Sequence, residues 1–373
     1  MMQISPETQL FIREHSSDDV RVLALQAKKY PDIDMPTAIT QIAGRKVAAE
    51  KIPSWWEIEK IWYPKHLSLE QCSSEITARY KARLLQGDSL TDLTGGFGID
   101  CSFLATGFKS TTYVERQEEL CEIAAHNFPV LNLNHINIKN EDGVTYLQAM
   151  SPVDCLFLDP ARRNEHGGKT VAISDCEPNV AELEELLLQK ANRVMIKLSP
   201  MLDLSLALKE LKQTQEVHIL SVNNECKELL ILLGQTSPTE ISSHCVNLST
   251  KGTQEEQHFV FTREQEQCSE CTYTDSLETY LYEPNASLLK AGAFRSIAAA
   301  YPVRKLHPNS HLYTSDTFIE NFPGRIFRIV NQCSFNKKEV KENLADLKKA
   351  NVTVRNFPAT VAELRKRIQD RKS

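Results

Sequence analysis

The spacing of hydrophobic and polar positions changes along this chain. Residues 1–85 place apolar residues three and four apart, as in DDVRVLALQAKKY and EITARYKARLL, which predicts helices. From about Gly87 to Gly234, short apolar runs alternate with amphipathic stretches, one of which lies between Glu115 and Phe128. The runs predicted as strands are SLTDLT, TTYVER, VDCLFLDP, ANRVMIKLSP, EVHILSV and LLILLG. This alternation is typical of an α/β fold, with a parallel sheet that carries helices on both faces.

The remaining part of the chain has another pattern. Residues 235–285 are polar and acidic, and runs such as EQHFVFTRE suggest hairpins or a small sheet. From Phe322 we predict strand RIFRIV, helix NKKEVKENLADLKKA, strand NVTVRNF and helix TVAELRKRI, an order found in half or more of a ferredoxin-like module. The predicted parts are a helical region (1–85), a doubly wound α/β domain (86–235), an α+β region (236–321) and a basic ferredoxin-like module (322–373).

Charge is distributed unevenly. Residues 322–373 carry 13 Lys or Arg and 5 Asp or Glu, a balance of +8, whereas the whole chain carries −6. Such asymmetry is typical of a nucleic-acid-binding module joined to a domain with another task. A solvated, basic helical surface would give the same charge.

Composition favours an ordinary globular protein, with 41% hydrophobic and 25% charged residues. No export signal and no run of about 18 apolar residues is found, so we expect no membrane span. The ten cysteines have no regular spacing, which predicts reduced thiols in the cytoplasm. Cys268 and Cys271 form a CxxC without a second pair, so we expect no metal.

A glycine-rich turn follows the first predicted strand. In TDLTGGFGID, Gly95, Gly96 and Gly98 would bring backbone amides close to a ligand at a helix N-terminus. A dinucleotide fingerprint fits imperfectly, because Cys101 stands where Gly or Ala is expected. A phosphate loop also fits imperfectly, because GGKT at 167–170 has Arg163 at the position of the first glycine.

S-adenosylmethionine is the third candidate ligand. Asp92 would attract its sulfonium or amino group, and Glu115 would hold its ribose hydroxyls, as a carboxylate about 20 residues on does in dinucleotide sites. Glu141 and Asp142, in the run NEDGVTYL, would recognise adenine. Each carboxylate alone could be a strand-end cap, but together they follow successive strands at the edge where open α/β sheets bind ligands.

The segments DLTGGFGID, VER, EDG and DPARR resemble class I S-adenosylmethionine-dependent methyltransferases. The segments EQCSSEITARYKA, IKLSPMLD, YLYEPNASLLKAGAF and KLHPNSHLYTSD extend the resemblance to bacterial methyltransferases with a C-terminal THUMP-like domain. The resemblance implies a Rossmann-like methyltransferase sheet, a THUMP-like region over 236–321, S-adenosylmethionine as cofactor, and RNA (tRNA or rRNA) as substrate. The predicted cofactor-binding residues are Asp92, Thr94, Gly95, Gly96, Phe97, Gly98, Glu115, Arg116, Glu141, Asp142, Gly143 and Asp159.

DPARR is where we expect the chemistry. Methyltransferases that act on base amino groups use Asn or Asp, two prolines and an aromatic residue to hold the target nitrogen and stack on the base. Asp159 and Pro160 match this pattern, whereas Ala161 and Arg162 depart from it, which argues against N6-adenine methylation. The predicted catalytic residues are Asp159, Pro160, Arg162 and Lys197, the last of which would meet RNA phosphate, close the pocket or lie in solvent.

Two further matters stay open. Gln71, Ser73, Ser74 and Thr77 precede the first strand and would roof the cofactor site or cap a helix. The function also has two alternatives to an RNA methyltransferase: an RNA-binding protein that binds S-adenosylmethionine without methyl transfer, and a methyltransferase of proteins or small molecules.

Overall fold

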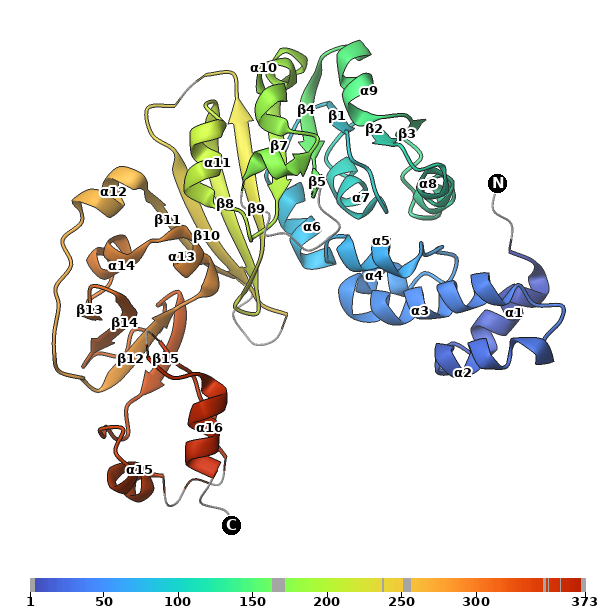
Figure 1. Ribbon diagram of the computed structural model, residues 1–373. Helices are drawn as coiled ribbons and strands as arrows, with labels where there is room; N and C mark the ends of the chain where they lie inside the picture. The colour runs from blue at the N-terminus through green and yellow to red at the C-terminus, as the bar shows by residue number, and fades with distance from the viewer. Residues whose placement is uncertain are drawn as a thin grey trace. The chain divides into compact units, whose positions relative to one another are not determined.

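The computed structural model describes residues 4–162, 172–236, 238–250, 256–344, 347, 349–355 and 357–369. The chain divides into two compact units (Figure 1). Unit 1 comprises Met1–Leu220 and Lys227–Ile241, and unit 2 comprises Ser221–Cys226 and Ser242–Ser373. No helix among the described residues is both long and apolar enough to cross a membrane.

Unit 1 begins with helices, as the apolar spacing predicts. They are α1 (Pro6–Glu14), α2 (Val20–Leu25), the 3-10 helix η1 (Ala27–Lys29), α3 (Met35–Lys51), α4 (Pro53–Trp56), α5 (His66–Gln71) and α6 (Glu75–Ala82). Asp34 caps α3 by accepting the backbone N–H of Thr37. Trp55 is buried and meets Phe97 edge to face at 5.2 Å between ring centroids. This contact joins the helical region to the glycine-rich turn.

The rest of unit 1 alternates strands with helices. The strands are β1 (Ser89–Asp92), β2 (Ser110–Glu115), β3 (Ile136–Asn140), β4 (Val153–Leu158), β5 (Ala161–Arg162), β6 (Cys176–Glu177), β7 (Ala191–Leu198), β8 (Thr214–Val222) and β9 (Glu225–Gly234). The helices are α7 (Ile99–Ala105), α8 (Glu118–Val130), α9 (Gly143–Ala149), the 3-10 helix η2 (Ile173–Asp175), α10 (Val180–Lys190) and α11 (Leu204–Glu210). The predicted helix between Glu115 and Phe128 is therefore confirmed.

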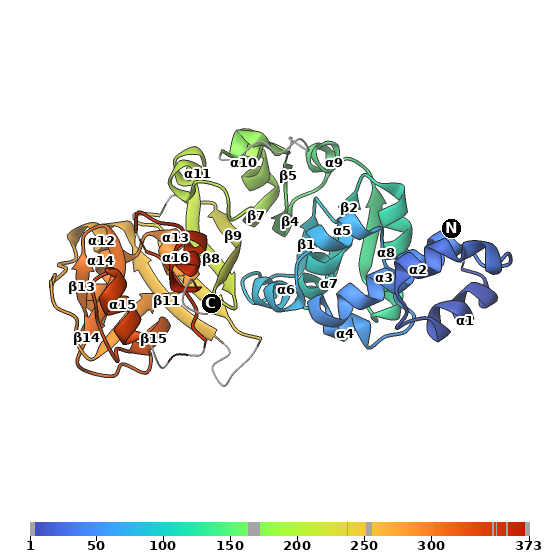
Figure 2. The ribbon, with the colours of Figure 1, turned by 60° about the horizontal axis from the view of Figure 1, so that its bottom comes forward.

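The main sheet of unit 1 has the strand order β8-β9-β7-β4-β1-β2-β3. Neighbours among β7, β4, β1, β2 and β3 are parallel, whereas β9 runs antiparallel to β7. Helices α6, α7 and α8 lie on one face, and α9, α10 and α11 lie on the other (Figure 1, Figure 2). The predicted doubly wound sheet is thus confirmed, with β9 as an antiparallel insertion.

The strand order reverses at β1. The chain proceeds from β1 outward through β2 to β3, and then returns to place β4 on the other side of β1. Open α/β sheets bind ligands outside the carboxyl ends of the strands at such a switch point. β1 ends at Asp92 and β4 ends just before Asp159, so the topology places both carboxylates there.

Unit 2 holds a second sheet with the order β13-β14-β12-β15, in which all neighbours are antiparallel. Its elements are β10 (Ser242–Leu248), β11 (Glu256–Thr262), α12 (Arg263–Cys268), β12 (Tyr280–Pro284), α13 (Ala286–Ala291), α14 (Phe294–Ala300), β13 (Arg304–His307), β14 (Ser310–Ser315), β15 (Gly324–Arg328), α15 (Lys337–Asn343) and α16 (Val361–Gln369). The hairpin predicted around EQHFVFTRE is confirmed by the antiparallel pairing of β10 with β11.

One predicted strand of unit 2 is wrong. The described residues 351–355, from NVTVRNF, form no strand. Instead Arg355 pairs with the buried carboxylate of Glu283 on β12, which also pairs with Arg325 on β15. An ion pair therefore attaches this segment to β12. The alternation of valine with polar residues in the segment did not lead to pairing with a neighbouring strand.

Candidate active site at the switch point

The glycine-rich turn connects the end of β1 to the start of α7. Asp92 is fully buried, and its Oδ1 accepts the backbone N–H of Thr94 at 3.0 Å. Gly96 and Gly98 have φ values of +53° and +86°, a left-handed conformation that favours glycine. A Cβ on Gly96 would have no heavy atom closer than 3.8 Å, so there is space for a ligand beside the turn.

Glu115 closes β2 beside this turn. Its Oε2 accepts the N–H of Gly96 at 2.9 Å, and its Oε1 accepts the N–H of Gln117 at 2.8 Å. Each carboxylate oxygen can accept two hydrogen bonds, so both retain capacity for a ligand hydroxyl. At the end of β3, Asp142 caps α9, because its Oδ1 accepts the N–H groups of Val144 and Thr145, both at 3.0 Å.

Asp159 follows β4 and is linked directly to the turn. Its backbone N–H donates to the Thr94 hydroxyl at 2.6 Å, so one threonine bridges the ends of β1 and β4. The Asp159 side chain is 37% exposed, and its Oδ2 accepts a hydrogen bond from Lys197 Nζ at 2.5 Å. No described residue donates to Oδ1. Pro160, the next residue, is buried.

Lys197 lies near the carboxyl end of β7, as predicted, but it points inward. Its side chain is 11% exposed, and Nζ lies 2.5 Å from Asp159 Oδ2 and 3.5 Å from Asp100 Oδ2. This geometry favours an internal ion pair over contact with RNA phosphate.

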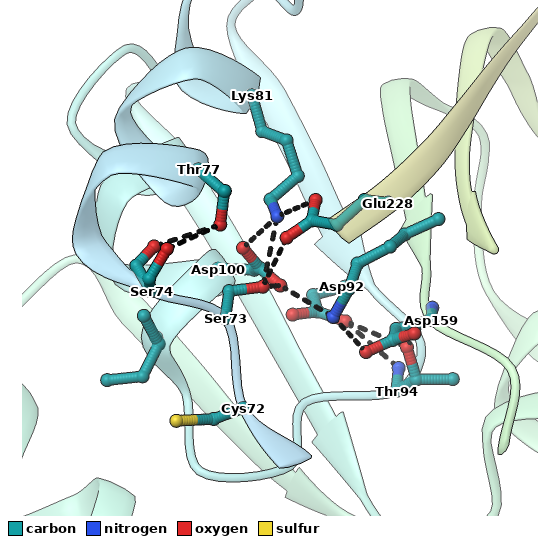
Figure 3. Close-up of polar contacts among 12 residues, drawn as sticks. Cys72, Ser73, Ser74, Thr77, Lys81, Asp92, Thr94, Asp100, Asp159 and Glu228 are labelled. Carbon is teal, nitrogen blue, oxygen red and sulfur yellow. Dashed lines mark hydrogen bonds and ion pairs between the residues drawn. The ribbon is translucent and has the colours of Figure 1, made fainter. Parts of the chain in front are cut away.

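A second lysine lies behind this pair (Figure 3). Lys81 of α6 has no exposed side-chain surface, and its Nζ contacts Ser73 Oγ at 3.0 Å, Glu228 Oε2 at 2.5 Å and Asp100 Oδ1 at 3.0 Å. The contact with Asp100 is an ion pair. Ser73 Oγ donates to Asp100 Oδ2 at 2.7 Å. α6, α7 and β9 therefore meet in one buried polar cluster.

Opposing influences set the charges of these groups. Burial raises the pKa of Asp92 well above its usual range, and the nearby carboxylates of Asp100, Asp159 and Glu115 raise it further. Burial also raises the pKa of Asp159, although Lys197 opposes the rise and the side chain is partly exposed. Since no described lysine or arginine pairs with Asp92, its surroundings favour a cationic ligand.

For Asp100 and Lys197, the neighbouring charges outweigh the effect of burial on the pKa. Burial raises the pKa of Asp100, but the ammonium groups of Lys81 and Lys197 outweigh it and hold that pKa below its usual value. Burial lowers the pKa of Lys197, but Asp159, Asp100 and Glu228 together raise it well above its ordinary value. The surroundings therefore favour the charged forms of both Asp100 and Lys197.

The structure gathers most of the predicted site residues at one edge of the sheet. They are Asp92, Thr94, Gly95, Gly96, Gly98, Glu115, Asp159, Pro160 and Lys197, with Glu141, Asp142 and Gly143 at the adjacent end of β3. Phe97 differs, because its ring packs in the core against Trp55. Arg116 is exposed and pairs with Glu177 at 3.4 Å. The Arg162 side chain, Arg163 and the GGKT run lie outside what the structure describes.

Sequence reasoning missed Lys81, Asp100 and Glu228. One signal was available: Glu228 directly precedes the apolar run LLILLG, in which the residues from Leu229 to Leu233 are all fully buried. A carboxylate beside such a run must find a partner or stay protonated.

Two hollows among the described residues lie away from this edge. One, of about 220 Å³, is at the amino-terminal ends of the strands and is lined by residues such as Ser89, Val153 and Ala191. The other, of about 620 Å³, lies in unit 2 between His307, Asn309, Ser310 and Arg355. Neither hollow is lined by the carboxylates of the switch point, which are those of Asp92, Glu115 and Asp159.

The residues at the switch point fit S-adenosylmethionine. Asp92 offers a buried carboxylate without a described cationic partner, and Glu115 offers free acceptor capacity for hydroxyl groups. The absence of a side chain at Gly96 leaves space beside both acids. A cation that also carries a ribose matches this set of donors and acceptors.

Comparison with known proteins gives one extensive match. The crystal structure of a "putative methyltransferase" from Porphyromonas gingivalis W83 covers 99% of this chain and 93% of its own, with 34% identity and a TM-score of 0.86. A family model described as a ferredoxin-like domain matches residues 280–323, and one described as THUMP domain-like matches residues 324–372. The ferredoxin-like match thus precedes the THUMP-like match, the reverse of the order in our sequence analysis. No curated protein matches the chain.

Two other solved structures are more distant. A Streptococcus mutans protein described in the same words, in complex with SAH, has 13% identity and a TM-score of 0.32, and the match covers 43% of this chain and 96% of that one. An rRNA methylase from Streptococcus thermophilus has 14% identity and a TM-score of 0.31, with coverage of 43% and 93%. Likenesses this low carry no argument about function. The match to the Porphyromonas gingivalis protein extends over nearly the whole chain, and the C-terminal family models agree with it; this protein therefore belongs to the class I S-adenosylmethionine-dependent methyltransferase family with a C-terminal THUMP-like domain.

Proposed function

We propose that this protein transfers a methyl group from S-adenosylmethionine to a nitrogen atom of an RNA base in the cytoplasm. The observation that carries the proposal is the Thr94 bridge, which joins Asp92 to Asp159 at the switch point. Asp92 is buried without a described cationic partner, as a site for the cofactor's positive charge requires. Asp159 is partly exposed, and no described residue donates to its Oδ1, as a site for the methyl acceptor requires.

The division of labour follows from these positions. Asp92 and the turn at Gly96 would hold the methionine part of the cofactor, Glu115 its ribose, and the residues after β3 its adenine. When bound, S-adenosylmethionine supplies a methyl group on a positively charged sulfur, which leaves as a neutral thioether. Asp159 Oδ1 would accept the target's N–H, orient the nitrogen lone pair and take the proton that the nitrogen loses. Orientation of this kind can supply much of the rate enhancement.

The cofactor is tested by thermal unfolding with S-adenosylmethionine, S-adenosylhomocysteine, NAD and ATP, each added separately. A ligand at 100 times its dissociation constant stabilises the folded state by about 2.7 kcal/mol. We expect shifts with the first two ligands alone. Absence of both shifts, with a shift from NAD or ATP, would contradict the proposal.

Methyl transfer is tested with tritiated S-adenosylmethionine and total RNA from cells that lack this gene. We expect tritium in RNA with the wild type and none with Asp159→Asn. The matched control is Asp88→Asn, which removes an exposed carboxylate of unit 1 that pairs with Lys109 on the surface. Tritium in added protein instead of RNA would favour the protein-methyltransferase alternative, and cofactor binding without transfer to any acceptor would favour a binding protein.

RNA as the substrate is supported by unit 2, whose THUMP-like match falls in the basic segment. Arg365 and Lys366 are exposed on α16. Changing both to Ala should weaken RNA binding and reduce the salt slope of log Kd by about 0.7–0.9 for each phosphate that the protein no longer neutralises. The control changes Lys28 and Lys29, which are neighbours in η1 of unit 1. Equal weakening by the two pairs of changes would count against unit 2 as the RNA-binding surface.

A further inference from the structure

The buried charges of unit 1 form a chain that becomes more exposed toward Asp159. Side-chain exposure is 0% for Lys81, 6% for Glu228, 10% for Asp100 and 11% for Lys197, and it reaches 37% for Asp159. Each member comes from a different helix or strand or the turn that follows it. This series of charged side chains therefore has an enclosed end at Lys81 and an accessible end at Asp159.

The enclosed end is fixed in place. Lys81 Nζ donates hydrogen bonds to Ser73 and Glu228 and forms an ion pair with Asp100, all at 3.0 Å or less. Ser73 Oγ donates in turn to Asp100 Oδ2. Because Lys81, Asp100 and Glu228 come from α6, α7 and β9, Asp100 cannot move without disturbing several packed elements.

Lys197 links the fixed cluster around Lys81 to Asp159. Lys197 lies between Asp100 at 3.5 Å and Asp159 at 2.5 Å, both measured from Nζ. Burying so many charges is a poor way to stabilise a fold, because apolar residues of similar volume are often as stabilising or more so. Holding the accessible carboxylate of Asp159 in a fixed orientation is a function that would explain these buried charges.

We propose that Lys197 is a positioning residue: held from behind by Asp100 and the Lys81–Glu228 pair, it engages Oδ2 of Asp159, favours the ionised form of that carboxylate, and leaves Oδ1 to accept the N–H of the methylation target. This inference rests on the proposed function. The reaction's proton passes from the target nitrogen to Oδ1 and then to water.

Other charged groups also face Asp159. Asp92 comes from β1, Asp100 from α7 and Lys197 from β7, while Lys81 and Glu228 lie behind them. Asp92 and Asp100 favour the protonated form of Asp159, and Lys81 and Lys197 favour its ionised form. Removing Lys197 should therefore raise the pKa of Asp159, whereas a purely structural role for this lysine predicts no change in that pKa.

The test is a pH titration of Asp159 by NMR in the full-length protein labelled with ¹³C at the aspartate carboxyl carbon. Asp159→Asn identifies the signal. In Lys197→Met the titration midpoint of Asp159 should move to higher pH, and in Lys197→Arg it should stay near the wild-type value. The control Lys109→Met removes an exposed lysine that pairs with Asp88, and it should leave the midpoint unchanged.

A second variant covers the case in which Lys197→Met fails to fold. Lys197→Gln keeps a hydrogen-bond donor near Asp159 but removes the charge, so its midpoint should also move to higher pH. A midpoint that is the same in Lys109→Met and in whichever Lys197 variant folds would overturn the inference. The titration uses neither cofactor nor RNA. Failure of the proposed function would therefore appear separately, as wild-type protein that binds no S-adenosylmethionine.

Discussion

The hydroxyl of Thr94 accepts a hydrogen bond from the backbone N–H of Asp159, with 2.6 Å between oxygen and nitrogen. The backbone N–H of Thr94 donates in turn to Asp92. One residue of the glycine-rich turn therefore sets the distance between the carboxylate assigned to the cofactor and the carboxylate assigned to the methyl acceptor.

Thr94→Val should remove this link at almost constant volume. The Asp159 N–H would lose its acceptor, at an expected loss of about 1–3 kcal/mol in the free energy of unfolding. Urea denaturation measures the change, and tritium transfer measures the effect on activity. Thr106→Val is the control, because Thr106 is exposed and its hydroxyl donates only to the nearby carbonyl of Phe103. Equal destabilisation by the two variants would show that the Thr94 bridge contributes no more to the free energy of unfolding than an exposed hydroxyl does.

Glu115→Gln should weaken S-adenosylmethionine binding by about 1–3 kcal/mol, because a charged acceptor of ribose hydrogen bonds becomes neutral. The glutamine amide oxygen can still accept the N–H of Gly96, so the turn should keep its conformation. Isothermal titration calorimetry gives the affinity. Glu118→Gln, an exposed change in the first turn of α8, should leave it unaltered. Unchanged affinity in Glu115→Gln would remove this residue from the cofactor site.

The carboxylates at the switch point were predictable from sequence for a definite reason. Alternating strands and helices imply a parallel sheet, and the carboxyl ends of parallel strands share one edge. Asp92, Glu115 and Asp159 each end or follow a predicted strand, so their proximity follows from topology alone.

The cluster behind Asp159 was not predictable in this way. Glu228 reaches it because β9 is inserted antiparallel beside β7, and no local pattern specifies that insertion. Lys81 reaches it because α6 packs on α7, which places a lysine in a fully buried position. Phe97 shows the opposite failure, since its place inside the turn suggested a ligand contact while packing directed its ring toward Trp55.

Gly95→Ala should destabilise unit 1 through overpacking. A Cβ at this position would lie 2.2 Å from a ring atom of Tyr113, which is fully buried and donates its hydroxyl hydrogen to the Gly96 carbonyl. Forcing an extra carbon into such a core costs about 1–3 kcal/mol. Gly107→Ala is the matched control, because its nearest neighbour would be an oxygen of Leu104 at 3.7 Å. If Gly95→Ala were as stable as this control in urea, the close approach would have no energetic consequence.

Asp92→Asn should stabilise the protein without ligand at neutral pH and above. Because burial and the neighbouring carboxylates raise the pKa of Asp92, the folded state keeps this proton to higher pH than the unfolded chain does. The contribution of Asp92 to stability is therefore fully present below its unfolded pKa of about 4 and is lost as pH rises through the folded pKa. Asparagine stays neutral and can still accept the Thr94 N–H, so it avoids the loss.

Urea denaturation at about pH 4 and about pH 8 tests this sign. The midpoint of Asp92→Asn should exceed that of the wild type at the higher pH and match it at the lower pH. Affinity for S-adenosylmethionine should fall in the same variant, because the carboxylate that opposes folding is the one that attracts the positive sulfur. The exposed change Asp88→Asn should show no such pH-dependent gain. A variant that is less stable than the wild type at both pH values would mean that the ionised Asp92 is already compensated within the protein, and the cofactor's charge would then need another partner.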